Sequence, residues 1–204
     1  MTEFGFRQQI ITSLALIPAT FALWYAAGAP LAAPASWLAE RLMTWILGEV
    51  VLGSQLQDTI WMVISAFGEE NGVILFPAPS GENLAIQIDT RLVSYSVPFY
   101  AALLWGSRVS EPVLKFCIGL AVLWLVMALS LIGVAAKDLM LLAGSQFLER
   151  PGVPPADVIA VWYQFSVLLA PTLAPVMLWL SQLRGTPLWQ RLSRQLEAAS
   201  RSST

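Results

Sequence analysis

Long uncharged stretches alternate with short charged segments along this chain. Residues 116–136 form a run of 21 uncharged positions, and residues 158–183 form a second long run that contains two prolines. About 20 apolar residues in a helix cross the hydrocarbon core of a bilayer. Residues 10–27 are apolar over nearly that length, whereas residues 92–107 are uncharged but span only with help from their flanks or a locally thin bilayer. The pattern predicts about four transmembrane helices.

A different periodicity follows the first predicted span. Residues 36–52 have an amphipathic pattern with Ser36 as a reasonable N-cap. Its larger apolar residues fall near one face of a helix: Trp37, Leu38, Leu42, Trp45 and Ile46. We expect this helix to lie in the membrane interface.

Residues 53–90 are the only segment with the pattern of a structure outside the membrane. Three short runs, 59–66, 72–76 and 83–88, are separated by segments rich in glycine, proline and asparagine, which is typical of strands joined by turns. In the last run Leu84, Ile86 and Ile88 alternate with polar or small residues, as in a half-buried strand. The segment predicts a small antiparallel sheet or pair of hairpins.

The composition supports a membrane protein. Hydrophobic residues make up 57% of the 204 residues and charged residues only 12%, and the mean hydropathy is +0.67. One small soluble core cannot bury that much apolar surface, so lipid must cover the rest. We predict an α-helical polytopic membrane protein with a single membrane domain over residues 1–204, a β-rich extracytoplasmic insert at 53–90 and a basic cytoplasmic tail at 184–204.

Basic residues indicate which side each loop occupies. If both termini are cytoplasmic, seven of the eleven basic residues lie on the inner side, namely Arg7, Arg108, Lys115, Arg184, Arg191, Arg194 and Arg201. Lysine and arginine are enriched in cytoplasmic loops. We therefore expect a protein of the bacterial inner membrane with its insert in the periplasm.

The first apolar segment leaves a second interpretation open. Arg7 precedes it, and Ala27, Gly28 and Ala29 resemble the small-residue cleavage site of a signal peptide. Against cleavage, Trp24 and Tyr25 are typical of an aromatic belt at a membrane surface.

Few residues are suited to catalysis. The chain has no histidine, which is the commonest metal ligand and general base. The one cysteine, Cys117, lies at the start of an apolar run, where it is expected to be a small hydrophobe. No glycine-rich phosphate loop, carboxylate pair or metal-ligand spacing is present. We expect a protein that is not an enzyme and has no cofactor, no metal and no nucleic-acid partner.

Polar residues gather at the predicted outer ends of the spans, where an ionisable group must reach water, pair or serve a site. The candidate cluster consists of Arg91, Tyr95, Lys137, Asp138 and Gln164. Helix-end anchoring and interhelical packing are the simpler interpretations of each residue.

Several segments in order resemble the exosortase H-associated membrane proteins. The resemblance is carried by residues 14–18 with Trp24 and Tyr25, by 90–100 (TRLVSYSVPFY), by 133–137 (GVAAK), and by Trp162, Tyr163 and Gln164 leading to 174–176. It implies a bacterial inner-membrane accessory of a sorting transpeptidase that handles proteins with a C-terminal tripartite signal. It transfers no catalytic residue.

Three functions remain in competition. The first is a scaffold that assists an exosortase-like polytopic membrane protein, with membrane lipid as its other partner. The second is a small transporter or channel component, because the last span is broken by prolines and two spans begin with polar residues. The third is a membrane subunit of a pilus or secretion machine.

Overall fold

The structure is a computed structural model that describes residues 6–79, 82–107 and 109–183. The described chain is mostly helical, with two small sheets inserted between the second and third helices. The helices and helical turns are α1 (Phe6–Ala27), η1 (Ala29–Leu31), α2 (Ala33–Ile46), α3 (Arg91–Ser94), α4 (Ser96–Gly106), α5 (Pro112–Ala143), α6 (Ser145–Leu148), α7 (Ala156–Gln164), η2 (Phe165–Leu169) and α8 (Ala170–Leu183). The strands are β1 (Val51–Gln57), β2 (Ile60–Ser65), β3 (Gly68–Glu70), β4 (Val73–Leu75) and β5 (Ala85–Asp89).

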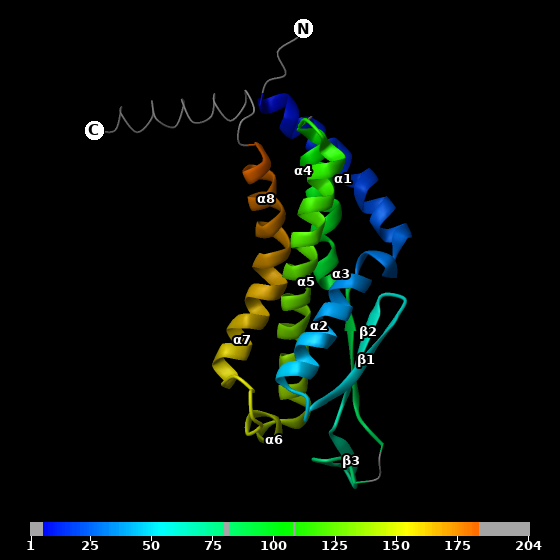
Figure 1. The fold of residues 1–204 in the computed structure, drawn as a ribbon, viewed down its shortest axis with the longest axis vertical. Helices are drawn as coiled ribbons and strands as arrows, with labels where there is room; N and C mark the ends of the chain where they lie inside the picture. Colours follow the sequence, from blue (N-terminus) through cyan, green and yellow to red (C-terminus); the bar gives the residue numbers. More distant parts are fainter. Residues whose placement is uncertain (1–5, 80–81, 108, 184–204) are drawn as a thin grey trace, which may run out of the picture.

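The longest helix, α5, is the axis of the molecule (Figure 1). Its 32 residues correspond to about 48 Å, which exceeds the roughly 30 Å of a bilayer's hydrocarbon core. Pro112 occupies its first turn, where a missing N–H is tolerated, and Gly144 ends it with φ of +56°. Figure 1 shows α4 and α8 beside one end of α5, called here the α4–α5 end, and the strands beside the other, called the sheet end.

Helices α1 and α4 pack closely at the α4–α5 end. Gly106 has no side chain, and Ser13 of α1 occupies the space that a Cβ atom at this position would need. Toward the sheet end, the indole Nε1 of Trp24 donates a hydrogen bond to Oγ of Ser94 at 3.1 Å. Small residues allow close helix approach in membranes, and hydrogen bonds between helices fix their register.

The helical path is interrupted between α1 and α2. Gly28 has φ of +57°, which an L-residue rarely adopts, so α1 ends there. The indole Nε1 of Trp124 on α5 donates to the carbonyl of Leu31 at 2.9 Å, which satisfies a backbone group left free by the break.

Helix α2 differs from its prediction in extent, and the residues that it buries are mostly small. It begins at Ala33, before the expected cap Ser36, and it ends at Ile46 because the chain then turns into β1. Ala35, Ser36, Ala39 and Met43 are buried, whereas Trp45 is 83% exposed and Trp37 is 58% exposed. A small-residue face lets α2 approach α5 closely, and the outward position of Trp37 and Trp45 leaves the expected contact of this helix with the membrane interface a prediction.

The insert forms a three-stranded antiparallel sheet in the order β1–β2–β5 and a separate β3–β4 hairpin. Three of the expected runs, 59–66, 72–76 and 83–88, correspond to β2, β4 and β5. Strands β1 and β3 were not expected, since the start of β1 had been assigned to the preceding helix. A two-residue turn joins β1 to β2, with Asp58 at φ of +50°.

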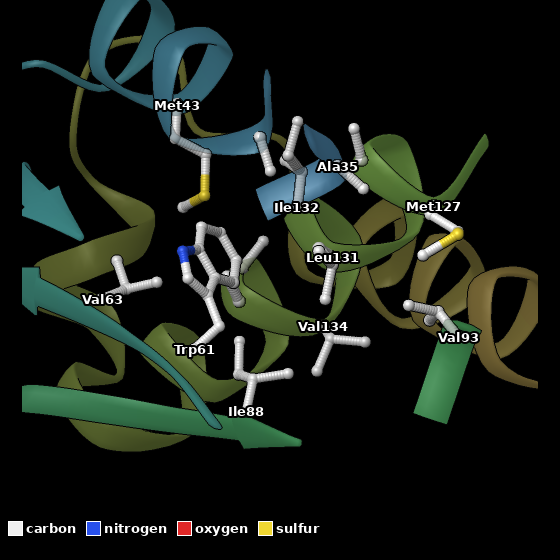
Figure 2. Close-up of a cluster of buried hydrophobic side chains, with 14 of the residues drawn as sticks. Ala35, Met43, Trp61, Val63, Ile88, Val93, Met127, Leu131, Ile132 and Val134 are labelled. Carbon is white, nitrogen blue, oxygen red and sulfur yellow. The ribbon is translucent and has the colours of Figure 1, made fainter. Parts of the chain in front are cut away.

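The sheet packs on α2 and α5 through one continuous apolar core (Figure 2). Trp61 of β2 is 1% exposed, and in Figure 2 its ring lies between Met43 of α2 and Ile88 of β5. Its Nε1 donates to Oγ of Ser54 at 2.8 Å, so the buried indole has a partner. Burial of a large aromatic side chain at this junction fixes the sheet against the helices.

Within the part of the chain that the structure describes, three helical segments are long and apolar enough to cross a membrane: Gln8–Ala27, Pro112–Ala143 and Ala156–Leu183. The fourth expected span, 92–107, consists of two short helices, α3 and α4, separated at Tyr95. The expected tail, 184–204, lies outside the described residues.

The last long segment is helical throughout but not regular. The π-helix η2 directly precedes Pro171, one of the two prolines at which a kink was expected. Proline has no N–H and its ring pushes away the carbonyl four residues earlier, which opens the preceding turn.

Candidate functional site

A pocket of about 250 Å³ lies where β5 meets the helices at the sheet end. Strand β5, helix α3, the last third of α5 and the end of α7 all contribute to it. Its lining residues are Gln87, Ile88, Asp89, Leu92, Val134, Lys137, Asp138 and Tyr163. We call it the β5 pocket. Its floor is apolar and its rim carries charge, so it can hold a chain or group that is partly apolar and partly polar.

Lys137 and Asp138 form an ion pair at the rim. Their side chains are 23% and 26% exposed, so water reaches both. Residues next to each other on a helix point about 100° apart and do not normally meet. Here both side chains turn toward the pocket, and the ammonium of Lys137 also lies 4.7 Å from the centre of the Tyr163 ring. The positive charge of Lys137 therefore has two partners within the protein.

Asp89 contributes a second carboxylate to the pocket. Its Oδ1 accepts a hydrogen bond from the backbone N–H of Arg91 at 2.9 Å, which fixes the turn from β5 into α3. Among the residues that the structure describes, Asp89 forms no ion pair. With Lys137 neutralised by Asp138, the pocket has an excess of negative charge.

The structure separates the five residues of the predicted cluster. Lys137 and Asp138 lie together in the pocket. Arg91 directly precedes Leu92, which lines the pocket, but the guanidinium of Arg91 lies 4.6 Å from the centre of the Tyr25 ring on α1. Tyr95 is half-buried at the break between α3 and α4, and Gln164 is exposed at the end of α7. Neither Tyr95 nor Gln164 lines the pocket.

Three polar residues of the pocket were absent from the predicted cluster: Gln87, Asp89 and Tyr163. The alternation that predicted β5 already placed Gln87 and Asp89 on the face opposite its isoleucines, which was the available signal. The contact of Tyr163 with Lys137 depends on how α7 packs against α5, so no signal in the sequence indicated it.

A second hollow, of about 490 Å³, lies on the outer side of α7. Its lining consists of Asp157, Val158, Val161, Trp162 and Phe165. The valines and the phenylalanine are each at least half exposed. We call it the α7 hollow. Its apolar character suits lipid chains or a helix of another membrane protein.

Polar groups at the α4–α5 end connect helices. The hydroxyl of Tyr100 lies 2.7 Å from Oε1 of Gln182 and 2.9 Å from the carbonyl of Lys115, to which Nε2 of Gln182 also donates. Trp179 donates through Nε1 to Oγ of Ser107, whose backbone carbonyl accepts from Nε2 of Gln9. These contacts join α1, α4, α5 and α8, and we interpret them as structural.

Cys117 is exposed on α5 near this end, and it is the free thiol of the described chain. The sequence suggested a small hydrophobic side chain in an apolar run, and an exposed position on a helix long and apolar enough to span a membrane is compatible with that interpretation. Among the described residues, no group of three or more carboxylate or cysteine side chains gathers in a way that could hold a metal ion.

Long apolar helices with exposed apolar faces define the chain as a polytopic α-helical membrane protein. The family model of the exosortase H-associated membrane proteins matches residues 3–186, so the chain belongs to this family and the resemblance noted in the sequence is confirmed. Searches of curated proteins and of solved structures gave no match.

Proposed function

We propose that this protein is a non-enzymatic accessory that holds an exosortase-type sorting enzyme and its client protein together in the bacterial inner membrane. The family match over residues 3–186 is the observation that carries the proposal, because the family's description names a membrane protein associated with exosortase H. The β5 pocket is in keeping with a binding role: its polar side chains are an amide, two carboxylates, an ammonium and a phenol, with no cysteine or serine nucleophile.

The proposal includes an orientation in the membrane. Both termini are cytoplasmic, the strands are periplasmic, and α3 with α4 forms a short fourth crossing. Its support is the excess of basic residues on the cytoplasmic side. Arg91 at the start of α3 contacts Tyr25, and Lys137 contacts Tyr163. Basic and aromatic side chains of this kind anchor helices at a membrane surface.

The α7 hollow is the surface that we assign to the enzyme. It is apolar, it lies on a helix that faces outward, and the π-helix η2 interrupts the regular helix at its edge. Interrupted turns of this kind are frequent at functional sites. Asp157 lies at the rim in the first turn of α7 and can form an ion pair with a basic residue of a partner helix.

Two valines of equal exposure provide a test. Val161 in the hollow is 66% exposed and Val113 on α5 is 65% exposed. We would tag the full chain in its native bacterium, extract it in mild detergent and measure how much exosortase co-purifies. Replacing Val161 with tryptophan should reduce recovery at least about fivefold, since overfilling a packed contact costs about 1–3 kcal/mol, and Val113→Trp should leave recovery unchanged.

Three results would contradict the proposal. Recovery of the chain alone as a homo-oligomer would remove the accessory function and favour the transport alternative. Recovery of many subunits would favour a secretion machine. Equal recovery with both tryptophan variants would place the enzyme on another surface.

A further inference from the structure

Strand β5 is an edge strand, and Gln87, Ile88 and Asp89 of this strand line the β5 pocket. In the order β1–β2–β5, β2 is the one strand of the described chain that pairs with β5. The N–H of Thr90 donates to Thr59 and the N–H of Ser65 donates to Leu84, at the two ends of this pairing. Hydrogen-bonded and non-bonded pairs alternate in an antiparallel ladder. The peptide groups of residues 86 and 88 therefore point to β2, and those of 85, 87 and 89 point away from it.

The three residues that carry the outward peptide groups lie at the surface. Ala85, Gln87 and Asp89 are all exposed, and Gln87 and Asp89 line the pocket. The outward N–H and C=O of Gln87 have no partner among the described residues. An open edge of this kind is a template for another extended chain.

The charge of the pocket selects what can lie along this edge. Asp89 has no cationic partner among the described residues, and Lys137 is already held by Asp138 and by the Tyr163 ring. A basic side chain entering the pocket would meet Asp89 and Asp138, whereas an acidic one would be repelled. Ile88, Leu92 and Val134 supply apolar contact for a neighbouring side chain.

We propose that the free edge of β5 binds an extended segment of a client membrane protein by strand addition, with a basic side chain of that segment in the β5 pocket. The segment lies just outside the membrane, because the pocket is at the level of Lys137 and Asp138, where the uncharged part of α5 ends. The inference deepens the proposed function and rests on it for the identity of the client.

The size of the pocket favours a chain over a free small molecule. Its volume of about 250 Å³ is below the usual range of about 300–1,000 Å³ for small-molecule sites. A strand needs little enclosed volume, because backbone hydrogen bonds along the edge supply affinity and the pocket supplies selectivity.

The test uses the full chain in phosphatidylcholine nanodiscs and a fluorescent peptide in which threonine and valine alternate around one central lysine. Binding is measured by fluorescence anisotropy against the same peptide with glutamate in place of lysine. We expect the lysine peptide to bind and the glutamate peptide to bind at least about tenfold more weakly, because unlike and like charges at the pocket act in opposite directions.

Two substitutions at one position isolate the backbone contact. Gln87→Pro removes the outward N–H without breaking the ladder to β2, and proline is tolerated at such edge positions. Gln87→Thr keeps the N–H and is the matched control. Loss of one hydrogen bond should make the proline variant bind about two- to tenfold more weakly than the threonine variant, which lacks the glutamine side chain as well but keeps the N–H.

A third variant and a spectroscopic measurement keep the test valid if the proline variant does not fold. Asp89→Asn retains a side-chain oxygen that accepts the hydrogen bond from the N–H of Arg91. It should weaken binding of the lysine peptide about two- to fivefold, as expected for loss of a partly exposed ion pair. Infrared spectra of a ¹³C-labelled peptide should show a β-strand amide band only when the chain is present.

The proposal would be overturned if both peptides bound equally. It would also be overturned if Asp89→Asn left binding of the lysine peptide unchanged and the bound peptide gave no β-strand band. Loss of peptide binding when the chain is placed in nanodiscs that contain phosphatidylethanolamine would also overturn it, because the pocket would then bind a lipid amine. Dimerisation of the chain through β5 would overturn it as well. None of these peptide measurements involves the enzyme. A negative result with the peptide therefore leaves the co-purification result valid, and a negative co-purification result leaves the peptide result valid.

Discussion

Tyr100 of α4 lies over Gly119 of α5, and the hydroxyl end of its ring occupies the place where a Cβ atom at Gly119 would be. The tyrosine is fully buried, and its hydroxyl contacts Gln182 on α8 and the carbonyl of Lys115. Three helices therefore meet at one side chain, and the absence of a side chain at Gly119 makes the contact possible.

We predict that Gly119→Ala destabilises the protein by about 1–3 kcal/mol, the usual cost of overfilling a packed site. Tyr100 cannot move aside without losing its hydrogen bonds. Thermal unfolding in detergent, followed by the retention of monomeric protein, measures the change. Gly53→Ala is the control, because the nearest atom to its added Cβ lies 4.0 Å away, and a loss equal to that of Gly119→Ala would contradict the interpretation.

Two tryptophans of opposite burial give a second prediction. Trp61→Ala removes a ring that is 1% exposed and should cost about 3–5 kcal/mol, as large-to-small changes in a core do. Trp45→Ala removes a ring that is 83% exposed and should change stability by less than about 0.5 kcal/mol. Denaturant unfolding followed by circular dichroism distinguishes the two, and similar losses would mean that the sheet is not anchored on Trp61.

The ion pair at the pocket gives a third prediction. A double-mutant cycle with Lys137→Gln and Asp138→Asn should give a coupling energy of about 0.2–1 kcal/mol, because both side chains are partly exposed. Equilibrium unfolding of the natural chain, the two single variants and the double variant provides the four required values. A coupling above about 3 kcal/mol would show that the pair is sealed from water, and the β5 pocket would then be closed to a client.

Cysteine labelling tests the proposed orientation. In a Cys117→Ser background, a cysteine replacing Glu70 at the end of β3 should react with a membrane-impermeant maleimide in cells whose outer membrane alone is permeable. A cysteine replacing Ser110, in the loop between α4 and α5, should react only after the inner membrane is opened. Both positions are exposed, so the opposite pattern would reverse the orientation.

Features set by local chemistry were predictable from the sequence. The uncharged runs gave the three long helices, and alternation around Gln87 gave β5. The residues by which α2 packs on α5 were not predictable from hydrophobicity alone, because in a membrane protein small residues such as Ala35 allow helices to approach closely. Contacts such as that of Lys137 with Tyr163 were also out of reach, since they depend on how two helices pack.

The length of α5 has a consequence for any client. The helix is a single rigid rod, and Lys137 is 22 positions beyond Lys115, a rise of about 33 Å. In the proposed orientation, the open edge of β5 is therefore held at a fixed height above the lipid. A client whose extended segment begins where its own membrane helix ends can reach that edge directly, and each residue added between the two raises the segment by up to about 3.3 Å. The protein would then distinguish its clients by the distance between helix and strand as well as by charge.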